Sequence, residues 1–210
     1  MPVKSKGDKP HKLSFSKFRL DTAYKALSLR RMTLWKIELI DRPASEIFYH
    51  YLKRLQESFD LQRSEESKKL IIDLIFVEAT TNFPNLKVWK GAPLESPIAR
   101  GEADYLITEN IGYISTPMLC VIEAKRDDFE QGLAQCLVEM QACQWNNLQD
   151  NRSIEVFGIV TNGEGWKFYK LTQENQVYET VLYSLDSLSK VLGILDFIFQ
   201  ACDRSLSEKI

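Results

Sequence analysis

The stretch that decides the fold is Met118-Leu119-Cys120-Val121-Ile122-Glu123-Ala124-Lys125. Its first five residues form a continuous apolar run, which indicates a strand buried on both faces at the centre of a sheet. Alternate residues of a strand point to the same face, so Glu123 and Lys125 project together while Ala124 points the other way. Because an unpaired buried charge is costly, this pair predicts an edge of the sheet, occupied by an ion pair or by a functional site.

Asp104 belongs to a second predicted strand, residues 103–108, which is followed by a turn region at 110–112. If the two strands are antiparallel neighbours, Asp104 lies across from Glu123. Two converging carboxylates without a histidine are hard oxygen ligands that suit Mg²⁺ or Mn²⁺. Such an ion polarises a phosphoryl oxygen and helps to ionise a bound water, and Lys125 would position or deprotonate that water or stabilise negative charge. The residues therefore point to phosphodiester hydrolysis.

Hydrophobic periodicity places the remaining elements. Helices are predicted at about 45–59, 64–82, 129–145 and 185–201, and further strands at 86–89, 154–160 and 166–171. The last two strands are joined by a hairpin signal, Thr-Asn-Gly-Glu-Gly, at 161–165. This order predicts an α/β fold, a three-layer α/β/α sandwich with a central mixed sheet.

The composition is that of an ordinary globular protein, with 210 residues, 44% hydrophobic and 27% charged. No apolar run approaches the roughly 20 residues of a membrane span, and the first ten residues do not have the apolar core of a secretory signal. The four cysteines have no CxxC spacing, so free thiols in a reducing compartment are expected rather than a zinc site. The sequence thus predicts a cytoplasmic protein that does not interact with membranes.

The charge is distributed unevenly along the chain. Residues 1–40 hold ten Lys/Arg and three Asp/Glu, a net +7 that leaves −9 for residues 41–210 within the total of −2. A basic arm on an acidic body would bring a polyanion to a site lined by carboxylates. We expect residues 1–12 to be a solvated tail, whereas the apolar residues from Leu13 onward predict packing on the domain. Residues 1–40 are therefore interpreted as a basic, partly packed extension, and 41–210 as one catalytic domain.

An ion pair at the surface would explain Glu123 and Lys125 without any site. Three further features favour the interpretation of Asp104, Glu123 and Lys125 as a functional site. Gly101 precedes Asp104 and allows close approach of the backbone. The Glu-x-Lys motif ends an apolar strand and leads straight into a helix. That helix carries two glutamines one turn apart on one face, Gln131 and Gln135.

These motifs resemble the PD-(D/E)XK, restriction-endonuclease-like nuclease superfamily. The resemblance rests on Gly101-Glu-Ala-Asp104-Tyr, Val121-Ile-Glu123-Ala-Lys125 and Gly132-Leu-Ala-Gln135. Within this superfamily the sequence is similar to the N-terminal nuclease modules of type I restriction enzymes, which often carry a hairpin like the one at 158–168. The resemblance covers about residues 64–175 and implies a restriction-endonuclease-like fold.

The resemblance also implies roles for individual residues. Asp104, Glu123 and the backbone carbonyl of Ala124 would bind the metal. Lys125 would be the catalytic lysine, and Gln135 would hold the substrate or the side chains of the site. The family often has a further acid on the helix before the sheet, for which the candidates are, in this order, Glu78 and Glu66. Two positions depart from the family pattern: Ala103 replaces the proline before Asp104, and Glu139 stands where a tyrosine is frequent.

Substrate contacts are expected from basic and amide side chains beside the site. Arg100 precedes it, Arg126 follows it, and both residue types hold phosphate groups well. Solvated surface charge is the equal alternative, because Asp127 and Asp128 adjoin Arg126. Gln131 on the helix is a further candidate.

The function that these expectations favour is a hydrolase: a Mg²⁺-dependent (or Mn²⁺-dependent) nuclease acting on DNA, in defence, mobile-element or repair contexts. One alternative is a catalytically silent protein of the same fold that binds nucleic acid or a protein partner. A structural α/β module whose charges merely pair is another. Cleavage of both strands of a duplex would favour a homodimer or a larger complex.

Overall fold

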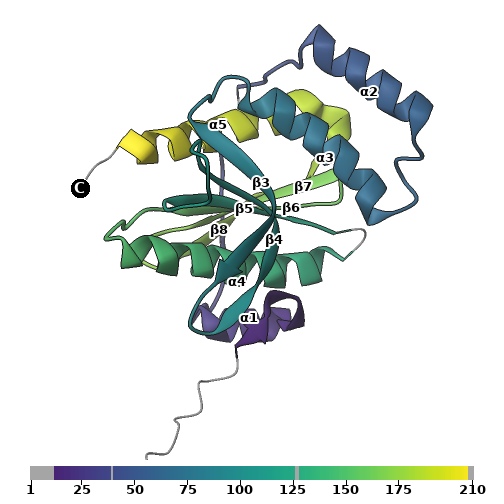
Figure 1. Cartoon of the computed structure of the whole chain (residues 1–210). Helices are drawn as coiled ribbons and strands as arrows, with labels where there is room; N and C mark the ends of the chain where they lie inside the picture. Colours follow the sequence, from purple (N-terminus) through teal and green to yellow (C-terminus); the bar gives the residue numbers. More distant parts are fainter. Residues whose placement is uncertain (1–11, 39, 126–127, 208–210) are drawn as a thin grey trace, which may run out of the picture.

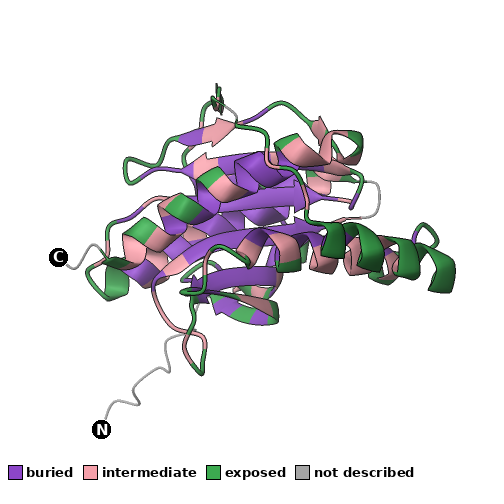
Figure 2. Ribbon diagram, turned by 90° about the horizontal axis from the view of Figure 1, so that it is seen from above, coloured by how far each residue is buried: buried purple, intermediate pink, exposed green. Residues whose placement is uncertain are grey.

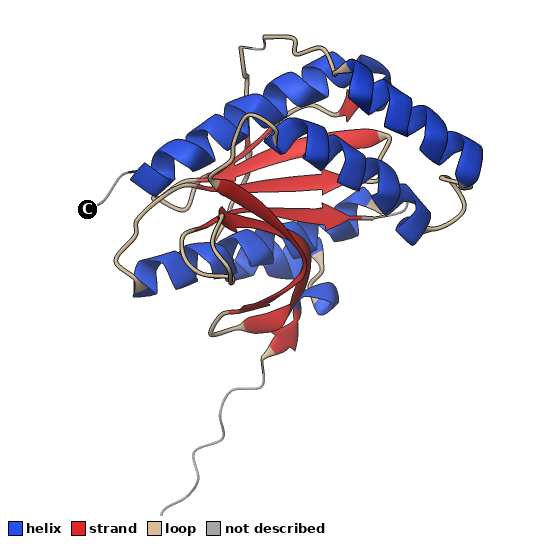
Figure 3. Ribbon diagram, turned by 45° about the horizontal axis from the view of Figure 1, so that its top comes forward, coloured by secondary structure: helices blue, strands red, loops and turns tan. Residues whose placement is uncertain are grey.

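The computed structural model describes residues 12–38, 40–125 and 128–207. It is an α/β sandwich in which helices cover both faces of a central mixed sheet (Figures 1 and 3). The α/β class and the mixed sheet predicted from the sequence are confirmed.

The sheet has nine strands within the described residues. The strand order is β1-β4-β5-β6-β7-β8-β2; in addition, β3 pairs with β4 and β9 pairs with β7. The pairs β4–β5 and β6–β7 are antiparallel and β5–β6 is parallel, with helix α4 as the crossover between β5 and β6. The bounds are β1 Leu13–Ser14, β2 Thr33–Leu34, β3 Leu86–Glu95, β4 Ala99–Glu109, β5 Met118–Ala124, β6 Val156–Thr161, β7 Gly165–Leu171, β8 Val177–Glu179 and β9 Tyr183–Ser184.

The helices form the two outer layers (Figure 1). Helices α3 and α5 cover one face of the sheet, α4 and α1 cover the other, and α2 lies outside α3. Their bounds are α1 Leu20–Ala26, α2 Glu46–Ser58, α3 Glu65–Thr80, α4 Phe129–Gln149 and α5 Leu188–Ser207. None of these helices is long and apolar enough to span a bilayer, as far as the described residues extend.

Strand β5 is buried on both sides, as its apolar run predicts (Figure 2). Ile122 belongs to the core under α3 and α5, and its neighbour Val121 to the core under α4. The two apolar clusters on opposite faces hold β5 at the centre of the sheet. The end of β5, where Glu123 and Lys125 stand, is therefore fixed by the whole core.

The N-terminal segment is part of the sheet. Strand β1 pairs with β4, the side chain of Phe15 is buried behind it, and α1 packs on α4. Strand β2 pairs with β8 at the other end of the strand order. The ring of Trp35 stacks on Phe157, with 6.1 Å between centroids. Of the tail predicted at 1–12, residues 1–11 lie outside the described residues, and the ammonium of Lys12 contacts the carboxylate of Glu95.

Candidate active site

The register of β4 and β5 brings the predicted carboxylates together. Tyr105 is paired with Ile122, so continuing the antiparallel register by one residue sets Asp104 opposite Glu123. Asp104 Oδ2 accepts a hydrogen bond of 2.9 Å from the backbone N–H of Ala124. This is the juxtaposition that the sequence predicts.

Glu123 and Lys125 point to the same face, toward α4. The carboxylate of Glu123 is fully buried and its Oε1 contacts the ammonium of Lys125. Its Oε2 accepts a hydrogen bond of 2.9 Å from Nε2 of Gln135. The structure thus gathers four of the predicted site residues, Asp104, Glu123, Lys125 and Gln135, around the end of β5.

Burial controls the charge of this pair. It raises the pKa of Glu123 to about 8; the charge of Asp104 adds to the rise, and the ammonium of Lys125 opposes it. For Lys125, burial alone would lower the pKa, but the carboxylate of Glu123 outweighs it and the net pKa is raised. Lys125 therefore carries its positive charge at neutral pH.

Two short-range features fix the position of Lys125. Its backbone N–H donates to the carbonyl of Thr161, at 2.9 Å, where the β6–β7 hairpin begins. Helix α4 passes closely over it at Gly132, where an added Cβ would lie 2.8 Å from Val160 Cγ1 and 3.0 Å from Lys125 Cγ. Only a residue without a side chain allows α4 to approach so closely.

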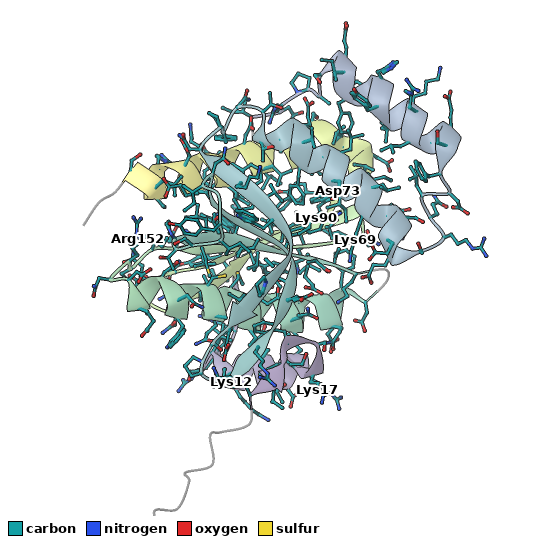
Figure 4. The ribbon with its side chains drawn as sticks, in the orientation of Figure 1. Lys12, Lys17, Lys69, Asp73, Lys90 and Arg152 are labelled. Atoms are coloured by element: carbon teal, nitrogen blue, oxygen red, sulfur yellow. The ribbon has the colours of Figure 1, made fainter. Side chains whose placement is uncertain are left out.

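Lys69 on α3 is a site residue that the sequence interpretation missed. Its ammonium contacts Asp104 Oδ1 at 3.0 Å, and also reaches Glu66 at 3.1 Å and Glu65 at 3.4 Å (Figure 4 shows its position). Burial lowers the pKa of Lys69, but the carboxylates of Asp104 and Glu66 outweigh that effect and raise it. The signal available in the sequence was a lysine three and four residues after two acids at the start of a predicted helix.

Glu139 on α4 was noted only as a departure from the family pattern. Its side chain is fully buried, and Oε1 accepts a hydrogen bond of 3.1 Å from the same Nε2 of Gln135 that bonds Glu123. Burial, followed by the charge of Glu123, raises the pKa of Glu139 well above its ordinary value. The signal was its spacing of four residues from Gln135, which puts both on one face of the helix.

Glu78, the first candidate for the helix acid, does not join the site. Its carboxylate accepts hydrogen bonds of 2.8 Å from the backbone N–H and the hydroxyl of Ser45, the N-cap residue of α2. Glu78 lies nine residues beyond Lys69 on α3, which at 1.5 Å per residue is roughly 13 Å along the helix. Glu66, the second candidate, is at the site end of α3, where it contacts Lys69.

The predicted substrate-binding residues have different fates. Gln131 donates from Nε2 to the carbonyls of Ser16 and Phe18, both at 3.1 Å, and so ties the N-terminal segment to α4. Arg100 is exposed on β4, and Arg126 lies outside the described residues. The space at Gly101 is taken by the ring of Phe15, 2.8 Å from the position of a Cβ, so it serves packing and does not face a ligand.

The donor set fits a hard divalent cation. Among the residues that the structure describes, no three or more His, Cys, Asp or Glu side chains gather as a metal site. Asp104 and Glu123 nevertheless supply carboxylate oxygens, and buried Glu123 Oε1 accepts no hydrogen bond of regular geometry although it contacts Lys125. Mg²⁺ typically binds one or two carboxylates and completes its shell with water and phosphate. The backbone carbonyl of Ala124 stays a predicted ligand.

Comparisons with known proteins give a distant relationship. No protein-family model matches the chain, and no solved structure matches it. The chain is 25% identical over 135 residues to Crinkler effector protein 5 of Phytophthora infestans. The match covers 62% of this chain and 36% of that protein, well under two thirds of the relative's length. The chain is thus weakly similar to part of a Crinkler effector.

Proposed function

We propose that this protein is a Mg²⁺-dependent phosphodiesterase that cleaves nucleic acid, with DNA as the first substrate to test. The single observation that carries the proposal is the convergence of Asp104, Glu123 and Lys125 at the end of the central strand β5. Such a trio has no structural task that a simpler ion pair would not perform, and burying its charges costs stability. A restriction-endonuclease-like nuclease of the PD-(D/E)XK kind is the reading that these residues support best.

The roles of the side chains follow from their contacts. Asp104 and Glu123 would hold the divalent cation, which would polarise the scissile phosphate and offset its charge. Lys125 is positively charged and partly exposed, so it would hold the attacking water or donate to a phosphate oxygen. Gln135 would orient Glu123 by its hydrogen bond to Oε2. Each role is one that phosphodiester hydrolysis requires.

A groove beside β4 supports a polyanionic substrate. It has a volume of about 730 Å³ and is lined by three basic side chains, Lys12, Lys17 and Arg100, together with the acidic Glu95 and Glu102. Arg100 precedes Asp104 by four residues on the same strand, roughly 13 Å at 3.3 Å per residue. Figure 4 shows Lys12 and Lys17 together beside α1, at the far end of the β3–β4 hairpin from Lys69. The lining does not include Asp104, Glu123 or Lys125, so the groove would hold a polyanion beside the carboxylates and not on them.

The test is a cleavage assay with Mg²⁺ or Mn²⁺ on plasmid, single-stranded and branched DNA and on RNA of matched sequence. Wild type should cleave at least one of these substrates, and Lys125→Ala should lower the rate by at least about 100-fold, as expected when charge stabilisation in a transition state is lost. The matched control is Lys53→Ala, an exposed lysine of α2 that pairs only weakly with Glu57 at 3.9 Å, and it should cleave like wild type.

A non-catalytic binder of nucleic acid or of a protein is the second candidate, and one observation favours it. The charges of the site are already paired within the protein: Asp104 with Lys69 and Glu123 with Lys125. The similarity to part of a protein named an effector is compatible with either function. Wild type that binds DNA with an affinity that Arg100→Ala weakens, but cleaves no substrate of the panel, would favour the binder and contradict the nuclease.

A further inference from the structure

The site contains two buried atoms whose lack of partners has a common explanation. Gln135 uses its amide Nε2 twice, donating to Glu123 Oε2 at 2.9 Å and to Glu139 Oε1 at 3.1 Å. Two oxygens beside this contact, the amide oxygen Oε1 of Gln135 and the second carboxyl oxygen Oε2 of Glu139, are buried and have no hydrogen-bond partner among the described residues. A buried acceptor without a donor costs roughly 1–3 kcal/mol, so two of them on adjoining side chains need a reason.

One proton satisfies both atoms. A protonated carboxyl is a donor as well as an acceptor, and it pairs with a primary amide through two hydrogen bonds: amide N–H to acid carbonyl, and acid O–H to amide carbonyl. The first of these bonds is the observed contact between Nε2 of Gln135 and Oε1 of Glu139. The second would join the two unpartnered atoms. An ionised carboxylate accepts only and would leave both unpaired.

We propose that Glu139 is a neutral carboxylic acid whose proton is donated to Gln135 Oε1, and that it thereby acts as a positioning residue for Glu123. With its carbonyl held by Glu139, the amide of Gln135 cannot turn over. Its second N–H is therefore always directed at Glu123 Oε2. Glu123 Oε1 is left facing Lys125 and the proposed cation.

The surroundings of Glu139 agree with this assignment. The groups that face it are the carboxylates of Glu123 and Asp104, the ammonium of Lys125, and the buried thiols of Cys136 and Cys143. The one cation among them contacts Glu123. Both carboxyls have a raised pKa, but only Glu123 has a cation beside it, so Glu139 keeps its proton to a higher pH than Glu123 does.

The direct test is carboxyl NMR on the metal-free full chain with ¹³C-labelled glutamate. The Glu139 side-chain resonance, assigned by its loss in Glu139→Gln, should keep the chemical shift of a neutral acid after the glutamates on the surface have lost their protons. Glutamates on the surface should lose their protons near the ordinary glutamate pKa of about 4.3. A Glu139 resonance that titrates with the surface glutamates would overturn the proposal.

Two variants separate the hydrogen-bonding pattern from simple packing. Glu139→Gln replaces the acid O–H by an amide N–H donor and keeps a carbonyl acceptor, so it can form the same paired geometry with Gln135, whereas Glu139→Leu cannot. The side-chain amide protons of Gln135 should be protected from exchange in wild type and in Glu139→Gln. Protection lost in Glu139→Gln would contradict the paired geometry, even if Glu139→Leu fails to fold.

The step from Glu139 to the metal site rests on the proposed function. Mn²⁺ affinity should fall by at least about tenfold in Glu139→Leu and be rescued in Glu139→Gln. If wild type binds no Mn²⁺, the proposed function fails while the NMR result still decides the protonation of Glu139. If wild type binds Mn²⁺ and Glu139→Leu binds it equally well, the positioning role is wrong and the metal site stands.

Discussion

Lys69 places a positive charge among the carboxylates that would hold the proposed cation. Its ammonium is within 3.0–3.4 Å of oxygens of Asp104, Glu66 and Glu65, and only 13% of its side chain is exposed. The lysine thus neutralises acidic groups that would otherwise repel one another. A divalent cation bound at Asp104 would compete with it for the same carboxylate.

Lys69→Met is therefore expected to destabilise the metal-free protein by ~1–3 kcal/mol, because it leaves partly buried carboxylates without their cation. Added Mn²⁺ should then raise the melting temperature more than it does in wild type. Chemical denaturation and thermal melts with and without Mn²⁺ measure both effects. Lys53→Met, at an exposed lysine, is the control and should stay within about 0.5 kcal/mol of wild type. Identical behaviour of the two variants would refute a neutralising role for Lys69.

Gln131 has a structural role in the folded protein, whereas its place in the sequence suggests a contact with the substrate. Its amide bonds the carbonyls of Ser16 and Phe18, so Gln131→Ala should cost about 1 kcal/mol of folding stability by loosening the N-terminal segment. Affinity for DNA, measured by fluorescence anisotropy, should not change. Unaltered stability combined with weaker DNA binding would support the substrate role instead.

At the scale of residues, the sequence identified the groups that lie on adjacent strands or one helical turn apart. Asp104, Glu123, Lys125 and Gln135 come together because strand alternation and helix periodicity are local rules. Lys69 reaches Asp104 across 35 positions, and Glu78 accepts hydrogen bonds from Ser45 at the start of α2; both contacts depend on how α3 is packed. Such long-range contacts have no periodic signature in the sequence.

Helix α4 depends on a glycine for its distance from β5. Gly132→Ala would put a methyl group 2.8 Å from Cγ1 of buried Val160 and 3.0 Å from Lys125 Cγ, and neither neighbour is a flexible chain end. We expect a loss of ~1–3 kcal/mol in stability and a displaced Lys125. Gly112→Ala is the matched control, since nothing lies within 4 Å of its Cβ position. Denaturant midpoints compare the two, and equal midpoints would show that α4 adjusts without strain.

The elements that the sequence failed to predict are short or interrupted. Strands β1, β2 and β9 have two residues each, too few to show an alternation. Strand β3 was expected to cover only residues 86–89 but continues through Gly91 and Pro93 to Glu95. Gly91 has φ +58° and accommodates the irregularity, and a proline is tolerated because β3 pairs with β4 alone and lies at an edge.

The stability of the whole molecule should depend on pH through the buried carboxyls. The pKa of Glu123 in the folded protein, about 8, lies above its ordinary value of 4.5, so the folded state binds more protons between these values. The corresponding stability is fully present below about pH 4.5 and is lost as the pH rises through about 8. Melting temperatures of the metal-free protein should fall over this range. In Glu123→Gln the melting temperature should fall less over this pH range, and the fall that remains would come from Glu139. Curves of melting temperature against pH that stay parallel for wild type and Glu123→Gln would contradict the assignment of the raised pKa to Glu123.

The layered architecture was predictable at the scale of the molecule because order and periodicity of the elements fix the α/β class. The place of the N-terminal segment in the sheet was not predictable from its basic charge. Phe15 and Phe18 are buried against the sheet and α4, so a segment expected to be partly packed completes the core instead. Charge composition describes what a segment repels or attracts, whereas burial depends on its few apolar residues.

The central claim is that Asp104 and Glu123 form a site for a divalent cation, and calorimetric titration of Mn²⁺ into the purified chain tests it most directly. Wild type should bind one Mn²⁺ per chain, Asp104→Asn should bind at least about tenfold more weakly, and Asp21→Asn, at an exposed aspartate of α1, should match wild type. Absence of binding to wild type, or equal affinity in wild type and Asp104→Asn, would contradict the account.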